Sequence, residues 1–379
     1  MIITVIIFIV ILSLLVFVHE AGHFIIAKRS GMGVHEFGFG FPPRVFGIQK
    51  QNGKWKLIWG KKPVDPESTV YSINAIPLGG FVKIMGEDND EAADPRSFTH
   101  KSFLARFGTL FAGVGMNVIT AWVILSIGFM IGLPIAVNGL DEVPKNAQFS
   151  EQQVLIGQVR ADSPAQAAGL KDSDIITKVD GQAFTEIEPL QEYIKANRGK
   201  TMKFEVMRIN EVVTADVTTS LEGDADKGLV GIGLAYYGKV KFGPVQSVWQ
   251  GAQTTVHQLK AIATGIVKIF SSKDGVKGVG GPVKIAQLTG QVADLGLLPL
   301  LQFTAFLSLN LAILNSLPFP ALDGGRMLFL IIEKLRGKPN NQSVEQYANA
   351  IGFMLLLLLM FVITARDVWQ LESIKNLFS

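Results

Sequence analysis

The stretch VFVHEAGHFIIAKR, residues 16–29, ends the first long apolar run of the chain, Ile2–Val18, and continues its helical pattern. His19 and His23 are four residues apart, so both imidazoles project from one face of a helix and can bind a single metal ion. Glu20 lies beside them, placed to take a proton from a metal-bound water. The stretch therefore predicts a membrane-entering helix that carries two metal ligands.

The depth of these residues in the segment strengthens the prediction. At 1.5 Å per residue, His23 lies roughly 8 Å and His19 roughly 14 Å inside the boundary at Lys28. Ionisable side chains at such depth are costly in hydrocarbon and are functional candidates. The alternative is a polar face that only packs helices through hydrogen bonds.

The composition is typical of a membrane protein with a water-soluble part. Of its 379 residues, 48% are hydrophobic and 18% are charged, with a mean hydropathy of +0.33. A disordered chain has few large apolar residues, and an ordinary soluble domain carries about 25% charged residues. The net charge of +3 is too even for a nucleic-acid binder. The absence of cysteine excludes disulfides, iron–sulfur clusters and thiol nucleophiles.

Four stretches are apolar enough to enter or cross a bilayer, which requires about 20 residues. A cleaved signal peptide is the alternative for the first stretch, but MIIT at its start has no basic residue and no small-x-small site follows it. The four stretches are about Ile2–Val18, Phe107–Pro134, Leu295–Leu317 and Tyr347–Thr364.

The roughly 160 residues between the second and third spans have a different character. Strand-like runs such as VLIGQVRA and KFEVMRI alternate with Gly, Asp and Asn turns around one short helical run, Pro189–Ala196. We expect a small mixed α/β domain here, roughly Gln153–Leu221. Val245–Phe270 then carries apolar residues at helical spacing, which fits a helix on the membrane surface or one packed on the soluble domain.

Basic residues indicate the orientation of the chain. Lys28 and Arg29 close the first span, and Lys101 and Arg106 open the second. The positive-inside rule places this connection and the one between spans three and four in the cytoplasm, and both termini and the soluble domain outside. The second connection holds Arg326, Lys334, Arg336 and Lys338.

A catalytic zinc has three protein ligands and an open position for water. The third ligand is expected in NSLPFPALDGGR, residues 315–326, where Pro318 and Pro320 end a helix. Irregular backbone at membrane depth is tolerated only where it is buried or lines a wet cavity. Asp323 is either a ligand or the N-cap of the next helix, and the unfilled zinc position favours the ligand. His35, His100 and His257 are interpreted as ordinary polar residues.

HEAGH in a first span, NSLPFPALDGG in a late span and a soluble domain between them resemble the site-2 protease family of intramembrane zinc metalloproteases, in its bacterial branch of regulator-of-sigma-E proteases. The resemblance covers almost the whole chain in order. It implies His19, His23 and Asp323 as zinc ligands and Glu20 as the general base. It also matches Asn315 to a residue associated with holding substrate.

The second span contains AGVGMN, in which Gly113 and Asn117 match a Gly-x-x-x-Asn motif of the same family. Small residues in this motif permit close approach of helices. Packing is the main interpretation of both residues. The alternative for Asn117 is direct contact with substrate or support of the transition state.

Two segments resemble the membrane-associated β-region of the family. They are GFGFPPRVFGI, residues 38–48, and STVYSINAIPLGGFVKIMGE, residues 68–87. An exposed strand edge near the active site would hold an unwound substrate segment by backbone hydrogen bonds. The alternative is a plain cytoplasmic hairpin.

ADSPAQAAGLKDSDIITKVDGQ, residues 161–182, resembles a protease-associated PDZ domain. Such a domain either binds a peptide at a strand edge or gates access without a peptide ligand. The best-known branch of the family has two PDZ domains in tandem. Only one is visible here, because Gly223–Gly243 is too short for a second.

The expected fold is an α-helical integral membrane protein with four transmembrane segments, a membrane-associated β-sheet and an inserted extracytoplasmic PDZ domain of α/β type. The expected parts are a first transmembrane helix (1–30), a cytoplasmic or membrane-associated β-region (31–103), a second transmembrane helix (104–134), the PDZ domain (150–222), an amphipathic helix (244–270), a third transmembrane segment with the LDGG motif (295–335) and a fourth transmembrane helix (347–365).

The resemblance implies a Zn²⁺-dependent endopeptidase of the bacterial inner membrane, with its active site facing the cytoplasm. Expected substrates are transmembrane segments of single-span proteins, such as pre-cleaved anti-sigma factors and remnant signal peptides in regulated intramembrane proteolysis. Other expected partners are the lipid bilayer and a peptide ligand of the PDZ domain, with no nucleic acid. The rival hypothesis is an inactive PDZ scaffold with structural zinc. An ion carrier would need acidic or histidine pairs in several spans, and spans two and four have none.

Overall fold

The computed structural model describes residues 2–60, 62, 64–65, 67–87, 93–220, 229–271 and 280–369. The chain forms two compact units. The first comprises Met1–Ile124, Gln253–Gly290 and Phe303–Ser379, and the second comprises Leu125–Ala252 and Gln291–Gln302. The last two residues of the range expected for the PDZ domain, 221 and 222, and the first six residues of the linker 223–243 lie outside the described residues.

Four helices among the described residues are long and apolar enough to cross a membrane, as the sequence predicts. Only 6% of the most apolar window of the fourth is buried inside the protein. Its large apolar side chains therefore require lipid as their solvent. The four helices are α1 (Ile2–Arg29), α2 (Phe103–Ile131), α7 (Leu297–Ser316) and α9 (Gln342–Trp369).

The segment expected to span the membrane at 295–335 is two helices, α7 and α8 (Asp323–Arg336), separated by residues 317–322. The break follows from Pro318 and Pro320, which have no backbone N–H to continue a helix. With 14 residues, α8 is about 21 Å long, which is too short to cross a hydrocarbon core of about 30 Å. The break places Asp323 at the first turn of a new helix.

A three-stranded antiparallel sheet follows α1, in the order β2-β1-β3. The Gly-Phe stretch at 38–48 lies inside the long central strand, and the turn to β2 uses Asn52 and Gly53, both with positive φ. Among the described residues, Val70–Ile73 of β3 pair with β1 on both sides, whereas Gly80–Ile84 pair with β1 on one side only. The strands are β1 (Val34–Gln51), β2 (Lys54–Trp59) and β3 (Val70–Ile84).

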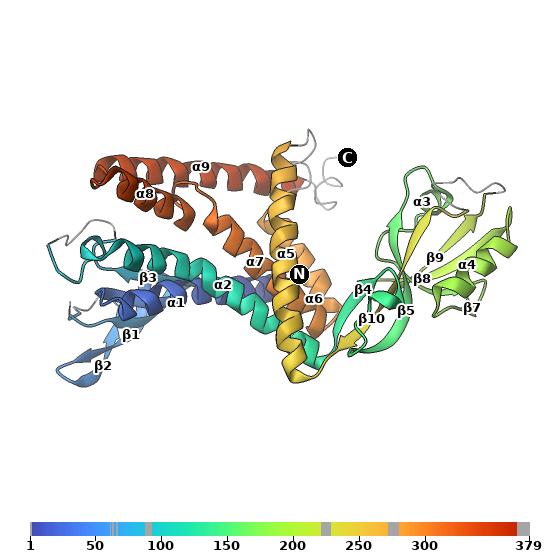
Figure 1. The fold of residues 1–379 in the computed structure, drawn as a ribbon, viewed down its shortest axis with the longest axis horizontal. Helices are drawn as coiled ribbons and strands as arrows, with labels where there is room; N and C mark the ends of the chain where they lie inside the picture. The colour runs from blue at the N-terminus through green and yellow to red at the C-terminus, as the bar shows by residue number, and fades with distance from the viewer. Residues whose placement is uncertain are drawn as a thin grey trace. The chain divides into compact units, whose positions relative to one another are not determined.

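Strand β3 packs directly against α1, and Figure 1 shows the sheet beside this helix. Close approach requires glycine, because a Cβ at Gly80 would lie 3.1 Å from Cα of Phe17 and 3.0 Å from the carbonyl oxygen of Gly38. Phe17 stands two residues before His19 in α1. The sheet is therefore anchored to the helix face next to the HEAGH motif.

The second unit is built around an antiparallel sheet with the strand order β4-β10-β5-β6-β8-β9, in which β7 pairs with β6. Two strands lie outside the predicted range 150–222: β4, which follows α2 directly, and β10. The strands are β4 (Leu133–Val137), β5 (Gln148–Val159), β6 (Ile175–Val179), β7 (Gln182–Ala183), β8 (Thr201–Arg208), β9 (Glu211–Thr218) and β10 (Ile232–Lys241).

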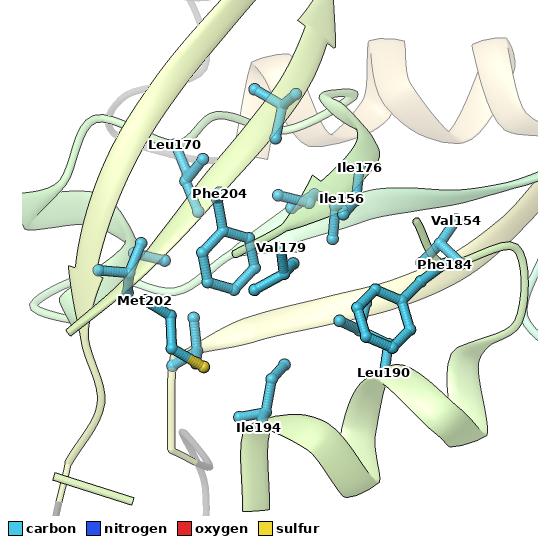
Figure 2. Close-up of a cluster of buried hydrophobic side chains, with 14 of the residues drawn as sticks. Val154, Ile156, Leu170, Ile176, Val179, Phe184, Leu190, Ile194, Met202 and Phe204 are labelled. Atoms are coloured by element: carbon cyan, nitrogen blue, oxygen red, sulfur yellow. The ribbon is translucent and has the colours of Figure 1, made fainter. Parts of the chain in front are cut away.

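Two helices complete this unit, α3 (Pro164–Ala167) and α4 (Ile187–Ala196). Ser163 caps α3, because its Oγ accepts a hydrogen bond from the backbone N–H of Gln166. The core lies between α4 and the sheet. Figure 2 shows Leu190 and Ile194 of α4 in one cluster with Val179 and Phe204, and all four are buried.

Strand β10 lies between β4 and β5. Its partner β4 covers the outer edge only from Tyr236 to Val240. At the same place, the hydroxyl of Tyr236 donates to Glu188 of α4 at 2.7 Å and accepts from the backbone N–H of Ile187 at 3.3 Å. One half of the β10 edge is thus closed by an internal strand.

The amphipathic helix expected at 244–270 is α5 (Pro244–Ser271). Its buried positions are small or polar: Ser247 and Thr255 are buried, and a Cβ at Gly251 would lie 2.9 Å from the backbone nitrogen of Ser126. Five of its large apolar side chains are exposed, as a helix on a membrane surface would require. The exposed residues are Val245, Val248, Trp249, Val256 and Val267. The remaining helix, α6, spans Pro282–Asp294, and two 3₁₀ turns span Phe98–His100 and Leu140–Glu142.

Candidate metal centre

Three side chains from two helices converge on one point of the first unit. Nε2 of His19 lies 2.9 Å from Oδ2 of Asp323, and Nε2 of His23 lies 3.3 Å from the same oxygen. The two Nε2 atoms are 3.2 Å apart. Among the described residues, these three form the group of histidine and carboxylate side chains that could hold a metal ion.

The geometry fits a metal ion better than a simple ion pair. Although both imidazoles are close, no hydrogen bond of acceptable geometry reaches Oδ2 of Asp323, a buried atom. In a tetrahedral zinc site with bonds of 2.0–2.1 Å, neighbouring ligand atoms lie about 3.3 Å apart. The observed separations of 2.9–3.3 Å are close to this value. The donor set, two imidazoles and one carboxylate, is also that of a catalytic zinc.

A backbone carbonyl group fixes the tautomer of His23. Its Nδ1 lies 2.8 Å from the carbonyl oxygen of Thr109 in α2. A carbonyl oxygen only accepts, so Nδ1 carries the proton and Nε2 keeps a free lone pair. His23 thus presents the nitrogen that a metal requires toward Asp323.

The second imidazole is held by Asn117. The Asn117 amide lies 3.2 Å from Nδ1 of His19, and its Oδ1 has no hydrogen-bond partner among the described residues. A rotation of this amide by 180° satisfies both groups, because Oδ1 then accepts from Nδ1–H. That arrangement leaves Nε2 of His19 free for a metal. Asn117 is fully buried, and its backbone carbonyl accepts from Ser308 of α7 at 2.7 Å.

Glycines on both sides give the imidazoles their space. A Cβ at Gly113 of α2 would lie 2.8 Å from Cε1 of His19 and closer still to Nε2 of His23. A Cβ at Gly22 would collide with the backbone carbonyl of Ala112. Helices α1 and α2 therefore meet at backbone distance where the histidines lie, as the small-residue motif predicts.

The glycines of the LDGG motif serve the same purpose at Asp323, the expected third ligand. A Cβ at Gly324 would collide with the carbonyl of Leu317, and one at Gly325 with that of Phe319. The first turn of α8 can therefore fold back onto the proline-containing break. Asp323 is the first residue of α8, and Leu322 occupies the N-cap position. The N-cap alternative for Asp323 is not what the structure shows.

Glu20 lies in α1 directly after His19, is partly buried and interacts electrostatically with both histidines and Asp323. Asn315 lies near the end of α7 and is half-buried. The other three histidines do not join the group of ligand atoms within the described part of the chain. They lie in β1 (His35), the 3₁₀ turn at 98–100 (His100) and α5 (His257).

One ion pair beside the site was not predicted. Arg326, in the first turn of α8, donates to Oε1 of Glu87 at 2.5 Å, and the two side chains are 31% and 15% exposed. Glu87 follows β3. A signal was present in the sequence, since an arginine three residues from Asp323 in an apolar helix favours a carboxylate partner.

Comparisons with known proteins agree with this geometry. The model of the family described as Peptidase family M50 matches residues 7–62 and 56–359. The "Regulator of sigma-W protease RasP" of Bacillus subtilis is 32% identical, over 97% of this chain and 99% of the relative. The "Zinc metalloprotease RasP" of Bacillus licheniformis is 30% identical, again over 97% and 99%.

Part of the chain is also similar to a solved structure, the PDZ domain of an SdrC-like protein from Listeria monocytogenes. The similarity covers 23% of this chain and 92% of that domain, with 30% identity and a TM-score of 0.20. The family match and the full-length relatives extend over both parts of the metal centre. The chain belongs to peptidase family M50, the site-2 protease family, and is a zinc metalloprotease.

Proposed function

We propose that the chain is an intramembrane zinc endopeptidase that cleaves transmembrane segments of single-span membrane proteins. The observation that carries the proposal is the convergence of His19, His23 and Asp323 inside a cluster of apolar helices long enough to span a bilayer. A hydrolytic site surrounded by such helices meets substrates that are themselves in the membrane. Exposed large apolar side chains on α1 and α9 support the same environment.

The roles follow from the geometry. His19, His23 and Asp323 would hold zinc, which supplies Lewis-acid polarisation of the scissile carbonyl and acidifies a bound water. Glu20 takes the proton of the attacking water and gives it to the leaving amine, because it lies next to the ligands on the same helix. Asn117 and Thr109 orient the two imidazoles through their Nδ1 atoms.

Two further residues complete the proposed site. Asn315, at the end of α7 and eight residues before Asp323, holds the substrate backbone beside the ligands. Asn117 supports the transition state through His19, since its amide is fully buried against that ring. Direct contact of Asn117 with substrate would require the imidazole of His19 to move first.

A substrate helix must be unwound before water can attack an amide, because an intact helix shields its carbonyl carbons. The edge of β3 along Gly80–Ile84 can hold the unwound segment by backbone hydrogen bonds. Next to it, a Cβ at Gly79 would lie 2.7 Å from Cγ1 of Val16, a residue that shares one face of α1 with His19 and Glu20. Strand addition there presents an extended substrate to the ligands.

We propose that the PDZ domain restricts access and does not act mainly as a peptide receptor. Strand β4 already pairs with Tyr236–Val240 of β10. A peptide that added along the whole of this edge would have to displace it. Short ligands could reach only the part of β10 before Tyr236.

The name of one relative suggests the proposed substrate class, and the basic residues of the sequence suggest the proposed orientation. One relative is named a regulator of sigma-W protease. We extend this to pre-cleaved membrane anti-sigma factors, with remnant signal peptides as a second class. The protein would lie in the bacterial inner membrane, with both termini and the PDZ domain outside and the site facing the cytoplasm.

The experiment compares purified wild type with Glu20→Gln on a panel of single-span substrates, with zinc content measured for each protein. The proposal expects cleavage within the apolar segment by wild type, and its loss in Glu20→Gln at unchanged zinc content. A cut outside the membrane segment, or equal cleavage by both proteins, would contradict the proposal. Absence of cleavage by either, at one zinc per chain, would instead support an inactive scaffold with structural zinc.

A further inference from the structure

The break between α7 and α8 contains four backbone N–H groups, because two of its six residues are prolines. Three of these groups bond locally: that of Leu317 to Leu314, that of Phe319 to Leu317 and that of Leu322 to Phe319, at 2.7–3.1 Å. The fourth belongs to Ala321. It donates at 3.1 Å to Oδ1 of Asn349, a residue of α9.

Ala321 has an unusual backbone conformation. Its φ is +76°, in the left-handed region that glycine adopts freely and alanine rarely does. Such a conformation persists only where the surroundings enforce it, and it is concentrated at functional sites. Ala321 stands two residues before Asp323, so this φ sets the direction in which the chain enters α8.

Helix α9 is pressed against the break at a second point. A Cβ at Gly352 would lie 2.5 Å from the carbonyl oxygen and 2.8 Å from Cβ of Pro320. Gly352 and Asn349 are three residues apart and share one face of α9. This face meets two successive residues of the break, one by packing and one by a hydrogen bond.

We propose that Asn349 is a positioning residue of the metal centre: by holding Ala321 in its left-handed conformation, it fixes the carboxylate of Asp323 opposite His19 and His23. Asn349 does not touch the ligands itself. The inference rests on the proposed role of Asp323 as a zinc ligand. It gives α9, which supplies no ligand, a direct part in zinc binding.

The chemistry explains why an amide is needed at this place. The N–H of Ala321 is part-buried where the break meets α9, and an unpaired donor there is unfavourable. Without the acceptor on Asn349, the strained φ of Ala321 can relax to a negative value. That change rotates the first turn of α8 and moves Asp323 away from the imidazoles.

The test measures zinc affinity of the purified full-length protein by competition with a chelator, after removal of metal. Asn349→Leu keeps the size of the side chain and removes the acceptor, and we expect zinc to bind 10- to 100-fold more weakly. Asn310→Leu is the matched control, because within the described residues the side chain of Asn310 bonds to the carbonyl of Phe306 in its own helix and to no other group. It should bind zinc as wild type does.

A conservative variant tests the hydrogen bond to Ala321. Asn349→Asp keeps an acceptor oxygen at the same distance along the side chain, so it should bind zinc much more tightly than Asn349→Leu. Wild-type affinity in Asn349→Leu, or equal losses in Asn349→Leu and Asn349→Asp, would overturn the proposal. If Asn349→Leu does not fold, Gly352→Ala takes its place. It should weaken zinc binding by pushing α9 from Pro320, and unchanged affinity would refute the role of α9.

Asp323→Ala separates this inference from the proposed function. Loss of zinc in Asp323→Ala with unchanged affinity in Asn349→Leu would refute only the role of Asn349. Retention of zinc in Asp323→Ala would refute the ligand assignment itself.

Discussion

Substitution of Gly113 by alanine should damage the metal centre without damaging the fold. The added Cβ would lie 2.8 Å from Cε1 of His19 and nearer to Nε2 of His23. Carbon atoms in contact are normally 3.5–4.0 Å apart. The two imidazoles or helix α2 must therefore move by about 1 Å to make room for the methyl group.

The magnitude follows from this displacement. Changes in groups that support metal ligands lower metal affinity about 10- to 100-fold, which corresponds to about 1.4 to 2.7 kcal/mol. A misplacement of about 1 Å at a reacting centre lowers the rate about 100-fold. Folding stability should not fall, because alanine is about 1 kcal/mol better than glycine inside a helix.

The assay compares Gly113→Ala with Gly115→Ala, the same change two residues further along α2. A Cβ at Gly115 would make an ordinary contact of 3.9 Å with Phe111. We expect weak zinc binding and slow cleavage only in Gly113→Ala, with thermal unfolding of both at or above the wild-type temperature. Wild-type zinc affinity in Gly113→Ala, or equal losses in both variants, would refute the reasoning.

Two predictions concern the PDZ domain. The side chain of Asp174 is 1% exposed and accepts hydrogen bonds from Nε and Nη2 of Arg208 at 2.7 and 2.6 Å. Asp174→Asn should therefore lower the free energy of unfolding of the domain by about 3 kcal/mol. Chemical unfolding measures this change, and an unchanged midpoint would contradict the prediction. The hydrogen bond from Tyr236 holds the pKa of Glu188 below its ordinary value of 4.5. Its stabilisation is therefore present above pH 4.5 and is lost as the pH falls through the lowered pKa. The melting temperature of wild type should fall more steeply on acidification than that of Tyr236→Phe. Parallel curves would show that the Tyr236–Glu188 hydrogen bond does not make the stability depend on pH.

The sequence predicts those parts of the site that depend on the spacing of residues close together in the chain. His19 and His23 share a helix face by their spacing alone, and the two prolines of the late motif end a helix wherever it lies. The four apolar helices follow from length and hydropathy. These features depend on neighbouring residues, so one sequence is sufficient to find them.

Other features depend on tertiary contacts and leave no local pattern. In the sequence, Asn349 is simply a polar residue in an apolar span. Only the structure shows that its side-chain oxygen accepts a hydrogen bond from the backbone N–H of Ala321. The sequence does not predict β4 and β10 as strands of the sheet, because both lie outside the PDZ-like stretch. Their pairing with each other, which the structure shows, makes them part of the sheet. The sequence also cannot show that the Gly-Phe stretch is the central strand of its sheet.

The most direct measurement is the X-ray absorption spectrum of zinc in the purified wild-type protein and in Asp323→Asn. The account predicts one zinc per chain with two imidazole nitrogens and oxygen ligands at about 2.0–2.2 Å, and loss of an oxygen ligand or of zinc in Asp323→Asn. A wild-type spectrum with one or three imidazoles would contradict it. So would a spectrum that does not change when Asp323 is replaced, because the metal would then not be held between the first span and α8.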